Sequence, residues 1–399
     1  MLGAVATVAL FVAGIAGAGC GDSARDPTSQ VSQTATGAAG TGSAEPAEER
    51  RPTRTLSDRA AHRALGPEEA LGQLLVGRYL GDRPPASFLA RVRAGELGGA
   101  ILFADNVEGG DGAVRRAISR LQHAAVESGN PPLLIFIDQE GGAIKRLPGP
   151  PELAPAQIES AGQAFLQGEL TGRYLRALGI NVDLAPVADA PTEESFIRER
   201  AFGADPATVA ERACAFARGL QAEGVAATLK HFPGLGLARS NTDSAATTVA
   251  APAAALRRDY APYRECGADP LTLTMLSSAR YPALTGDLPA VMATDTYAEE
   301  LPRAGVRGLT ISDDLEAPAL DAATSPAATA IAAGLNLALY AKTEQGSADA
   351  YSILSRRLEH GAFWRELVTR NARPVLALKA ILEPRLTARS LEQLGGGRP

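Results

Sequence analysis

Eight short runs of apolar residues recur along this chain, at residues 74–79, 98–103, 133–138, 180–186, 225–232, 271–276, 308–314 and 335–340. Stretches with helical periodicity lie between them, for example residues 112–129 and 206–224. Apolar strands that alternate with helices indicate a parallel sheet covered by helices. Eight such units over roughly 320 residues predict an α/β fold of the (β/α)8 TIM-barrel type, as a single domain over residues 66–390. An open doubly wound sheet is the alternative.

Charge and cysteine content exclude several classes of protein. The net charge is -6, which argues against nucleic acid as a partner because phosphate binding needs a basic surface. The three cysteines form no CxxC pair and the four histidines form no HExxH pair, so we expect neither a metal nor a cofactor. Cys214 and Cys266 are expected to be buried thiols, with a disulfide between them as the less favoured alternative.

The N-terminal segment predicts export and anchoring. Residues 2–19 are apolar and small, and they end at Cys20, as in a lipoprotein signal peptide over residues 1–20 that is cleaved before a lipidated cysteine. An uncleaved anchor or an incorrectly assigned start is the alternative. Residues 21–65 contain almost no large apolar side chain, which predicts a disordered tether. The domain would then sit outside the cell membrane, held there by its lipid.

Charged residues follow the apolar runs, where a barrel carries its chemistry. The C-terminal ends of barrel strands form the active-site face. Residues found at these positions are Asp138, Glu140, Asp189, Arg198, Arg200, Lys230, His231, Asp313 and Asp314. Any one of them could be a helix cap or a surface charge. Their joint occurrence at strand ends predicts an active site.

Several motifs occur in a characteristic order, namely GGAILFADN, IDQEGGAIKRL, INVDLAPVAD, RAFGADP, KHFPGLG, ISDDLEAPAL and AAGLNLALY. This ordered set resembles glycoside hydrolase family 3, and within it the single-domain β-N-acetylhexosaminidases of the NagZ type. The resemblance covers about residues 66 to 385. It implies a retaining glycosidase mechanism that passes through a covalent glycosyl-enzyme.

The resemblance also implies roles for individual residues. The first aspartate of the SDD motif, Asp313, takes the position of the nucleophile, and Asp314 is expected to support its loop. The substrate-binding positions of the family fall on Asp138, Arg146, Arg200, Lys230 and His231. Carboxylates accept hydrogen bonds from sugar hydroxyls, whereas arginine and lysine donate them. The alternative for the two arginines is a purely structural ion pair.

The loop after the KHFPG segment departs from the family pattern, which reads K-H-F-P-G-H-G, four variable residues and then D-S-H. Leu235 replaces the first histidine, and Asn241-Thr242-Asp243 falls on D-S-H. Asp243 therefore takes the position of the histidine that acts as the acid/base. A rival alignment with a two-residue insertion places Ala245 there. A carboxyl group is chemically competent, and we expect burial beside Asp313 to raise its pKa.

Two interpretations follow for the function. The first is a membrane-anchored, retaining exo-glycosidase that hydrolyses terminal β-linked N-acetylglucosamine, with peptidoglycan-derived fragments as substrates. The second is a pseudoenzyme, a sugar-binding lipoprotein that kept the pocket and lost the acid. Two further departures are Ala143, expected to reshape the rim of the pocket, and Asn336, expected to be structural. The oligomeric state is not predicted.

Overall fold

The computed structural model describes residues 65–320 and 325–382. The predicted signal peptide, Cys20 and the predicted tether lie outside these residues. In the described part of the chain, no helix is both long enough and apolar enough to cross a membrane.

Each of the eight apolar runs contains a parallel strand, as predicted. The strands are β1 (Leu75–Gly77), β2 (Gly99–Leu102), β3 (Leu134–Ile137), β6 (Val182–Asp183), β7 (Ala227–Phe232), β8 (Thr272–Leu276), β9 (Leu309–Ser312) and β10 (Ala338–Leu339). Every residue of these strands is buried, which explains why the runs are continuously apolar rather than alternating. An antiparallel hairpin of β4 (Gln139–Gly141) and β5 (Ile144–Lys145) follows β3 and was not predicted.

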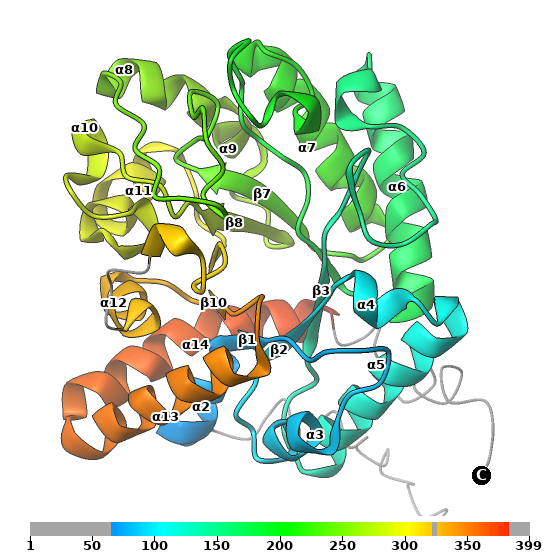
Figure 1. Ribbon diagram of the computed structural model, residues 1–399, viewed down its shortest axis with the longest axis vertical. Helices are drawn as coiled ribbons and strands as arrows, with labels where there is room; N and C mark the ends of the chain where they lie inside the picture. The colour runs from blue at the N-terminus through cyan, green and yellow to red at the C-terminus, as the bar shows by residue number, and fades with distance from the viewer. Residues whose placement is uncertain (1–64, 321–324, 383–399) are drawn as a thin grey trace, which may run out of the picture. The chain divides into compact units, whose positions relative to one another are not determined.

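The parallel strands pair in chain order around a curled sheet. One sheet has the order β10-β1-β2-β3-β6 and another the order β7-β8-β9. Single parallel bridges join the two, between Val182 and Ala226 and between Ile311 and Leu337. None of the eight strands is therefore left at an edge, an arrangement consistent with the predicted (β/α)8 barrel. The helices lie outside the strands (Figure 1).

Most connections between consecutive strands contain a longer helix, the connection from β8 to β9 being an exception, and two helices follow β10. The longer helices are α2 (Pro67–Gln73), α3 (Ala86–Arg93), α5 (Gly110–Glu127), α6 (Ala161–Leu178), α7 (Pro206–Ala222), α9 (Ala261–Cys266), α12 (Pro326–Ala333), α13 (Glu344–His360) and α14 (Ala362–Leu382). Four short helices lie in the connections, α4 (Ala104–Val107), α8 (Ala253–Leu256), α10 (Pro282–Thr285) and α11 (Leu301–Arg303). The predicted helical stretches 112–129 and 206–224 correspond to α5 and α7. Asp205 caps α7 by accepting hydrogen bonds from the amides of Ala207 and Thr208.

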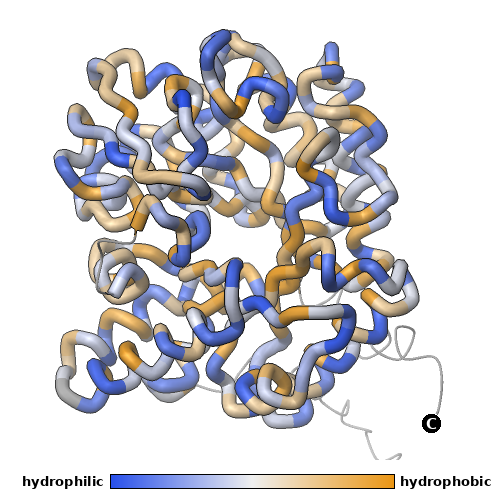
Figure 2. Tube along the Cα trace, in the orientation of Figure 1, coloured by the Kyte–Doolittle hydropathy of each residue, from blue (hydrophilic) through white to orange (hydrophobic). Residues whose placement is uncertain are grey.

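The hydrophobic core fills the space between the strands and their helices. Apolar residues follow the strands through the middle of the molecule, whereas hydrophilic residues are more frequent on the outer helices (Figure 2). Helices α6 and α7 approach closely because glycines face each other. A Cβ atom on Gly168 would lie 2.1 Å from the carbonyl oxygen of Phe216, and one on Gly219 would lie 2.3 Å from that of Phe165.

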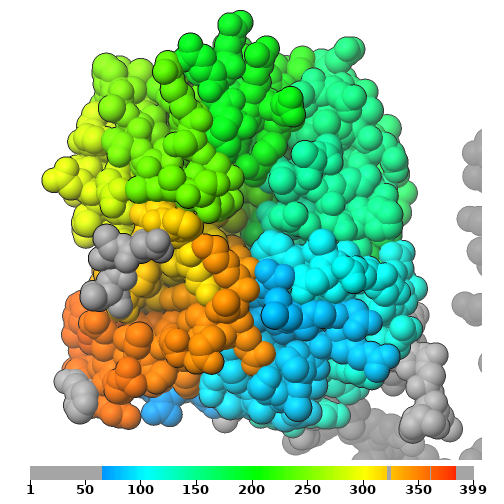
Figure 3. All heavy atoms as spheres, viewed as in Figure 1, coloured from blue at the N-terminus to red at the C-terminus, as the bar shows by residue number. Residues whose placement is uncertain are grey.

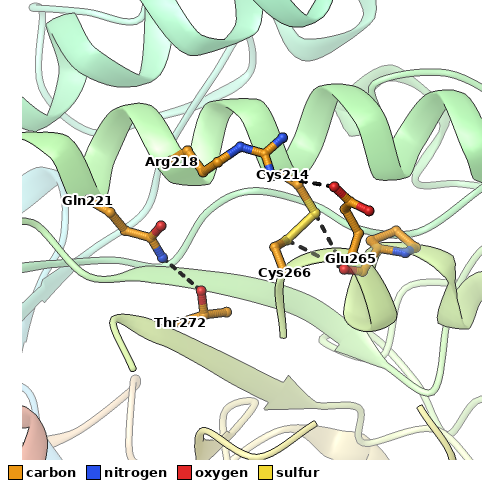
Figure 4. Close-up of a disulfide and its surroundings, with 7 residues drawn as sticks. Cys214, Arg218, Gln221, Glu265, Cys266 and Thr272 are labelled. Atoms are coloured by element: carbon orange, nitrogen blue, oxygen red, sulfur yellow. Dashed lines mark hydrogen bonds and ion pairs between the residues drawn. A yellow bond between two sulfur atoms is a disulfide. The ribbon is translucent and has the colours of Figure 1, made fainter. Parts of the chain in front are cut away.

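A disulfide joins Cys214 in α7 to Cys266 at the end of α9 (Figure 4). The prediction of two buried thiols is therefore wrong. The two Cα atoms lie 5.8 Å apart because α7 and α9 pack side by side, a proximity that a separation of 52 residues hides in the sequence. Gln221 of α7 also donates a hydrogen bond to Thr272 of β8 beside this link. Disulfides are typical of oxidising compartments.

Candidate active site

One cavity of about 270 Å³ lies at the C-terminal ends of the strands. It is lined by all seven residues that the sequence singled out for catalysis or substrate binding, namely Asp138, Arg146, Arg200, Lys230, His231, Asp243 and Asp313. Apolar side chains complete its wall, among them Phe103, Phe196, Met275 and Leu339. The structure thus brings together residues that are up to 175 positions apart in the chain, from Asp138 to Asp313.

The rim of the cavity joins the first and last parts of the domain. Ala341 and Lys342, which follow β10, line the cavity. Arg78, which follows β1, donates a hydrogen bond of 3.1 Å to the carbonyl oxygen of Ala341. Figure 3 shows the segment after β10, in orange, lying against the blue N-terminal part of the domain. The contact closes the ring of loops around the cavity.

Alternating charges form the floor of the cavity. The Asp138 carboxylate accepts hydrogen bonds from Lys230 Nζ at 3.0 Å and from Arg146 at 3.3 Å. The Glu140 carboxylate lies 2.5 Å from Lys230 Nζ and accepts two hydrogen bonds from Arg200, at 2.9 and 2.7 Å. Arg146 and Arg200 are therefore ion-paired as the alternative interpretation proposed, and both also line the cavity.

These pairings decide the charge of the floor. Burial by itself raises the pKa of Asp138, but the positive charges of Lys230 and Arg146 outweigh it and lower that pKa. Burial likewise raises the pKa of Glu140, and Lys230 and Arg200 outweigh it and lower that pKa. Burial favours neutral Lys230, yet Glu140 and Asp138 raise its pKa. The floor therefore carries two carboxylates facing a lysine and two arginines at neutral pH.

Two functional contributors were not assigned a role from the sequence. Glu140 holds Arg200 and Lys230 in place, and its only sequence signal is its position two residues after Asp138. Asp189 accepts a hydrogen bond of 2.8 Å from His231 Nδ1 and another of 2.7 Å from the amide of Leu235. Asp189 thus fixes the orientation of the His231 ring and the position of Leu235, at the start of the loop that follows.

Asp313 follows the last residue of β9, is half-buried and lies among other charged groups. Burial raises the pKa of Asp313, His231 acts in the opposite direction, and the negative charge of Asp243 raises it further. Its Oδ1 accepts a hydrogen bond from the amide of Asp314 at 2.9 Å. Asp314 accepts hydrogen bonds from the amides of Glu316 and Ala341, which joins the loops after β9 and β10. The predicted supporting role of Asp314 is confirmed.

Asp243 lies on the loop that follows β7, the fifth strand of the barrel order. Asn241 Oδ1 accepts a hydrogen bond of 3.0 Å from the amide of Asp243, within a turn that lines the cavity. Asp243 is exposed, so the predicted burial of its side chain beside Asp313 is wrong for this conformation. The physical reason is that the buried member of the turn is its neighbour, Thr242, which is 2% exposed.

An apolar cluster anchors the same loop. Leu235, at the position of a histidine in the family pattern, is buried with Ala238, Val249, Leu256 and Tyr281. A histidine there would place a polar ring among these apolar side chains. The start of the loop is therefore held by packing in this chain.

The two remaining departures from the family pattern, Ala143 and Asn336, lie outside the cavity lining. Ala143 is exposed in the turn between β4 and β5 and is not among the residues that line the cavity; its effect on the rim stays a prediction. Asn336 accepts hydrogen bonds from the amide and hydroxyl of Thr310 and donates one to the carbonyl of Asn371, as expected of a structural residue. Within residues 65–320 and 325–382, no group of three or more His, Cys, Asp or Glu side chains could hold a metal ion.

Comparison with known proteins identifies relatives over the whole described domain. The model of the glycosyl hydrolase family 3 N-terminal domain matches residues 68–378. The β-hexosaminidase LpqI of Mycobacterium tuberculosis is 34% identical over 240 residues, which are 57% of this chain and 59% of that protein. A β-hexosaminidase of Pseudomonas aeruginosa is 32% identical over 278 residues, which are 66% of this chain and 81% of that protein.

A solved structure resembles the same part of the chain. The family 3 β-N-acetylglucosaminidase from Paenibacillus sp. FPU-7 superimposes with a TM-score of 0.74 and 29% identity. The match covers 80% of this chain and 63% of that one. This chain therefore spans about three fifths of both the Mycobacterium and the Paenibacillus proteins.

Proposed function

This chain belongs to glycosyl hydrolase family 3, and we propose that it is a retaining exo-glycosidase that hydrolyses terminal β-linked N-acetylglucosamine. The observation that supports this activity is the single cavity that collects Asp138, Lys230, His231 and Asp313 at the C-terminal ends of the strands. The names of the relatives support the choice of sugar. They do not support the alternative of a sugar-binding pseudoenzyme.

The floor of the cavity would bind the terminal sugar. The carboxylate of Asp138 accepts hydrogen bonds from sugar hydroxyls, and Lys230, Arg146 and Arg200 donate them. Ion pairs already fix these side chains, so little conformational entropy is lost when the sugar binds. A pocket that closes over one sugar ring would explain cleavage from the end of a glycan.

In the first chemical step, an Asp313 oxygen attacks the anomeric carbon as the bond to the leaving oxygen breaks. Asp243 donates its proton to that oxygen, so the leaving sugar departs as a neutral alcohol. In the second step Asp243 accepts a proton from water, and the hydroxide oxygen replaces Asp313 at the anomeric carbon. Two inversions retain the β configuration, and both carboxyl groups return to their starting states.

The exposed position of Asp243 requires that its loop closes on substrate. For retaining hydrolysis the two carboxyl groups should come within about 5–5.5 Å of each other. Active-site loops commonly close only when substrate is bound. The cluster around Leu235 would act as the fixed base of this closure, and the turn at Asn241 and Asp243 as its moving end.

Hydrolysis of two chromogenic N-acetyl-β-glucosaminides, one with a good and one with a poor leaving group, tests the activity. We expect turnover of both, with the β-anomer as the first product seen by proton NMR. Release of the α-anomer would contradict the retaining mechanism. No turnover of either substrate, with N-acetylglucosamine still bound, would favour the pseudoenzyme.

We further propose that the enzyme acts outside the cell membrane, anchored through Cys20, on peptidoglycan-derived fragments. The apolar segment before Cys20 and the Cys214–Cys266 disulfide support an oxidising, extracytoplasmic location. Membrane fractionation of Cys20→Ser tests the anchor. Release of the variant from the membrane is expected, and unchanged association without processing would contradict lipidation.

A further inference from the structure

Helix α13 turns into α14 at the lower left of Figure 1, and basic and aromatic residues are concentrated at this turn. Phe363 is 64% exposed, although a phenylalanine is normally buried in a water-soluble domain. Its ring meets the edge of Trp364, and the guanidinium of Arg357 lies 5.0 Å above the Trp364 ring. Arg356, Arg357, Trp364 and Ile353 line a shallow hollow beside them. We call Arg356, Arg357, Phe363 and Trp364 the α13–α14 patch.

The charge of this region opposes that of the whole chain. Residues 356–373 contain five arginines and two glutamates, whereas the whole chain has a net charge of -6. Exposed aromatic rings beside arginines are typical of protein surfaces that meet phospholipid headgroups. The rings enter the boundary between headgroups and acyl chains, and the arginines attract anionic lipids. In the patch, Phe363 is an exposed ring, Trp364 beside it is half-buried, and the exposed Arg356 and Arg357 supply the positive charge.

The patch lies far from the candidate active site along α13. Helix α13 begins at Glu344, immediately after Thr343 caps it and two residues after Lys342 on the cavity rim. Its 17 residues span about 25 Å before the turn to α14. A surface that contacts the patch would therefore leave the cavity open to soluble substrates.

The chain enters the domain beside the same two helices. Helix α2, the first described element, packs against both α13 and α14. Its last residue, Gln73, accepts a hydrogen bond of 2.6 Å from Lys379 of α14. A lipid on Cys20, as proposed above, would hold the domain near a bilayer and raise the local concentration of lipid at the patch, so a weak contact would suffice.

We propose that the α13–α14 patch docks on an anionic phospholipid surface and orients the cavity away from the membrane. This docking rests on the proposed membrane location and not on the proposed catalytic mechanism. Attraction to anionic lipids contributes only modestly per arginine and is screened by salt. The docking is therefore reversible and depends on the lipid anchor for its local concentration.

The single tryptophan of the chain makes the docking measurable, because Trp364 belongs to the patch. The full-length lipidated protein is anchored to vesicles of phosphatidylcholine with phosphatidylglycerol, or of phosphatidylcholine alone. Brominated lipids quench a tryptophan that enters the boundary of the acyl chains. We expect quenching on the anionic vesicles at low salt, with loss of quenching at high salt and on neutral vesicles.

Matched variants separate the patch from general charge effects. Arg356→Ser/Arg357→Ser should weaken the quenching on the order of 10-fold, and Phe363→Ser should also weaken it. Arg116→Ser/Arg120→Ser removes the same charge from exposed positions of α5 and should leave quenching unchanged. Each quenching value is the ratio of emission with brominated to unbrominated lipid, which corrects for the loss of Arg357 from the Trp364 ring.

Three results would overturn the docking. The first is equal quenching on neutral and anionic vesicles, and the second is an equal loss of quenching in the α5 control variant. The third is a change of Trp364 emission with protein concentration in the absence of vesicles, which would assign the patch to a second copy of the chain. Hydrolysis of a soluble chromogenic substrate is measured in parallel. Inactivity there contradicts the proposed function, whereas active protein without lipid-dependent quenching contradicts only the docking.

Discussion

The floor of the cavity and the loop over it are built in opposite ways. The floor consists of charged side chains that are each held by at least one ion pair, with Glu140 and Lys230 buried at its centre and the others half-buried. The loop carries Asp243 on an exposed turn whose hydrogen bonds are local, and only its start is fixed by the apolar cluster around Leu235. Under the proposed mechanism, substrate binding would rest on a preorganised site, whereas proton transfer would rest on a segment that must move.

The contrast between the ion-paired floor and the loop is consistent with the positions at which this sequence departs from the family pattern. Glu140 and Lys230 are buried, so replacing either one removes a partner from the other's buried charge, which is costly. Asp243 is exposed, so we expect the type of its side chain to have little effect on the fold. Leu235 differs, because it is buried in an apolar cluster that packs the start of the loop.

The largest effect is expected from replacing Asp313, the proposed nucleophile. Asp313→Ala should lower kcat on every substrate by at least about 10³-fold, because no covalent intermediate can form. A slow fluorinated substrate should label Asp313 of the wild-type protein, as read by mass spectrometry of its peptides. Asp314→Asn is the matched control, since an amide oxygen can still accept the hydrogen bonds from Glu316 and Ala341. Label on Asp314, or equal losses in both variants, would refute the assignment.

The loop should respond according to the leaving group. Asp243→Ala should slow hydrolysis of substrates with poor leaving groups on the order of 10²–10⁴-fold, and much less for activated aryl glycosides, which hardly need protonation. Azide should partly restore the variant, because it attacks the glycosyl-enzyme without a base. Ser244→Ala, the next exposed residue of the loop, should behave as wild type. Equal slowing of both substrates by Asp243→Ala would mean that the turn is only structural.

Glu140→Gln tests whether preorganisation of the floor matters. The variant frees Arg200 and Lys230 from their shared carboxylate, and we expect kcat/KM to fall by up to about 10²-fold. If the floor contributed only to binding of the ground-state sugar, Glu140→Gln would raise KM and leave kcat unchanged. Glu199→Gln removes an exposed carboxylate next to Arg200 and should have no effect. Unchanged kinetics in Glu140→Gln would show that Arg200 and Lys230 do not need it.

The floor also predicts an acid limit to stability. Asp138 and Glu140 have lowered pKa values in the folded protein, so they bind fewer protons there than in the unfolded chain. Their contribution to the free energy of unfolding is complete above about pH 5 and is lost as the pH falls through the lowered pKa values. Calorimetry between neutral and acidic pH should show a steeper fall of Tm in the wild type than in Glu140→Gln. An equal fall of Tm with pH in the two proteins would contradict the assignment of the acid limit to these carboxylates.

The smallest effect on catalysis is expected from the disulfide, which lies outside both regions. Reduction should lower the free energy of unfolding by about 4 kcal/mol or less, given a separation of 52 residues between the cysteines, while kcat at ambient temperature stays unchanged. Thermal melting with and without reductant measures this. Cys214→Ala/Cys266→Ala should melt like the reduced protein and be insensitive to reductant. A loss of activity on reduction would contradict this expectation and would indicate that the packing of α9 influences the loop that carries Asp243.

Much of the fold was predictable because its signals are local. Each apolar run contains a strand, and the stretch that begins at Pro206 forms α7 behind the cap of Asp205. The hairpin of β4 and β5 was missed because its residues are few and charged, and side-chain contacts rather than propensity place them. Gln139 illustrates this, since its buried amide binds the backbone at Arg146 and Leu147.

The sequence by itself determined the family, the positions of the strands and the seven charged residues expected in the cavity, because ordered motifs at strand ends must meet when a parallel sheet closes. Only the tertiary structure decided which charges pair, that Cys214 and Cys266 are bonded, and that Asp243 is exposed. These properties depend on distances between segments remote in the chain. Burial and neighbouring charge, which set the protonation of Asp138, Glu140 and Asp313, exist only once those segments have packed together.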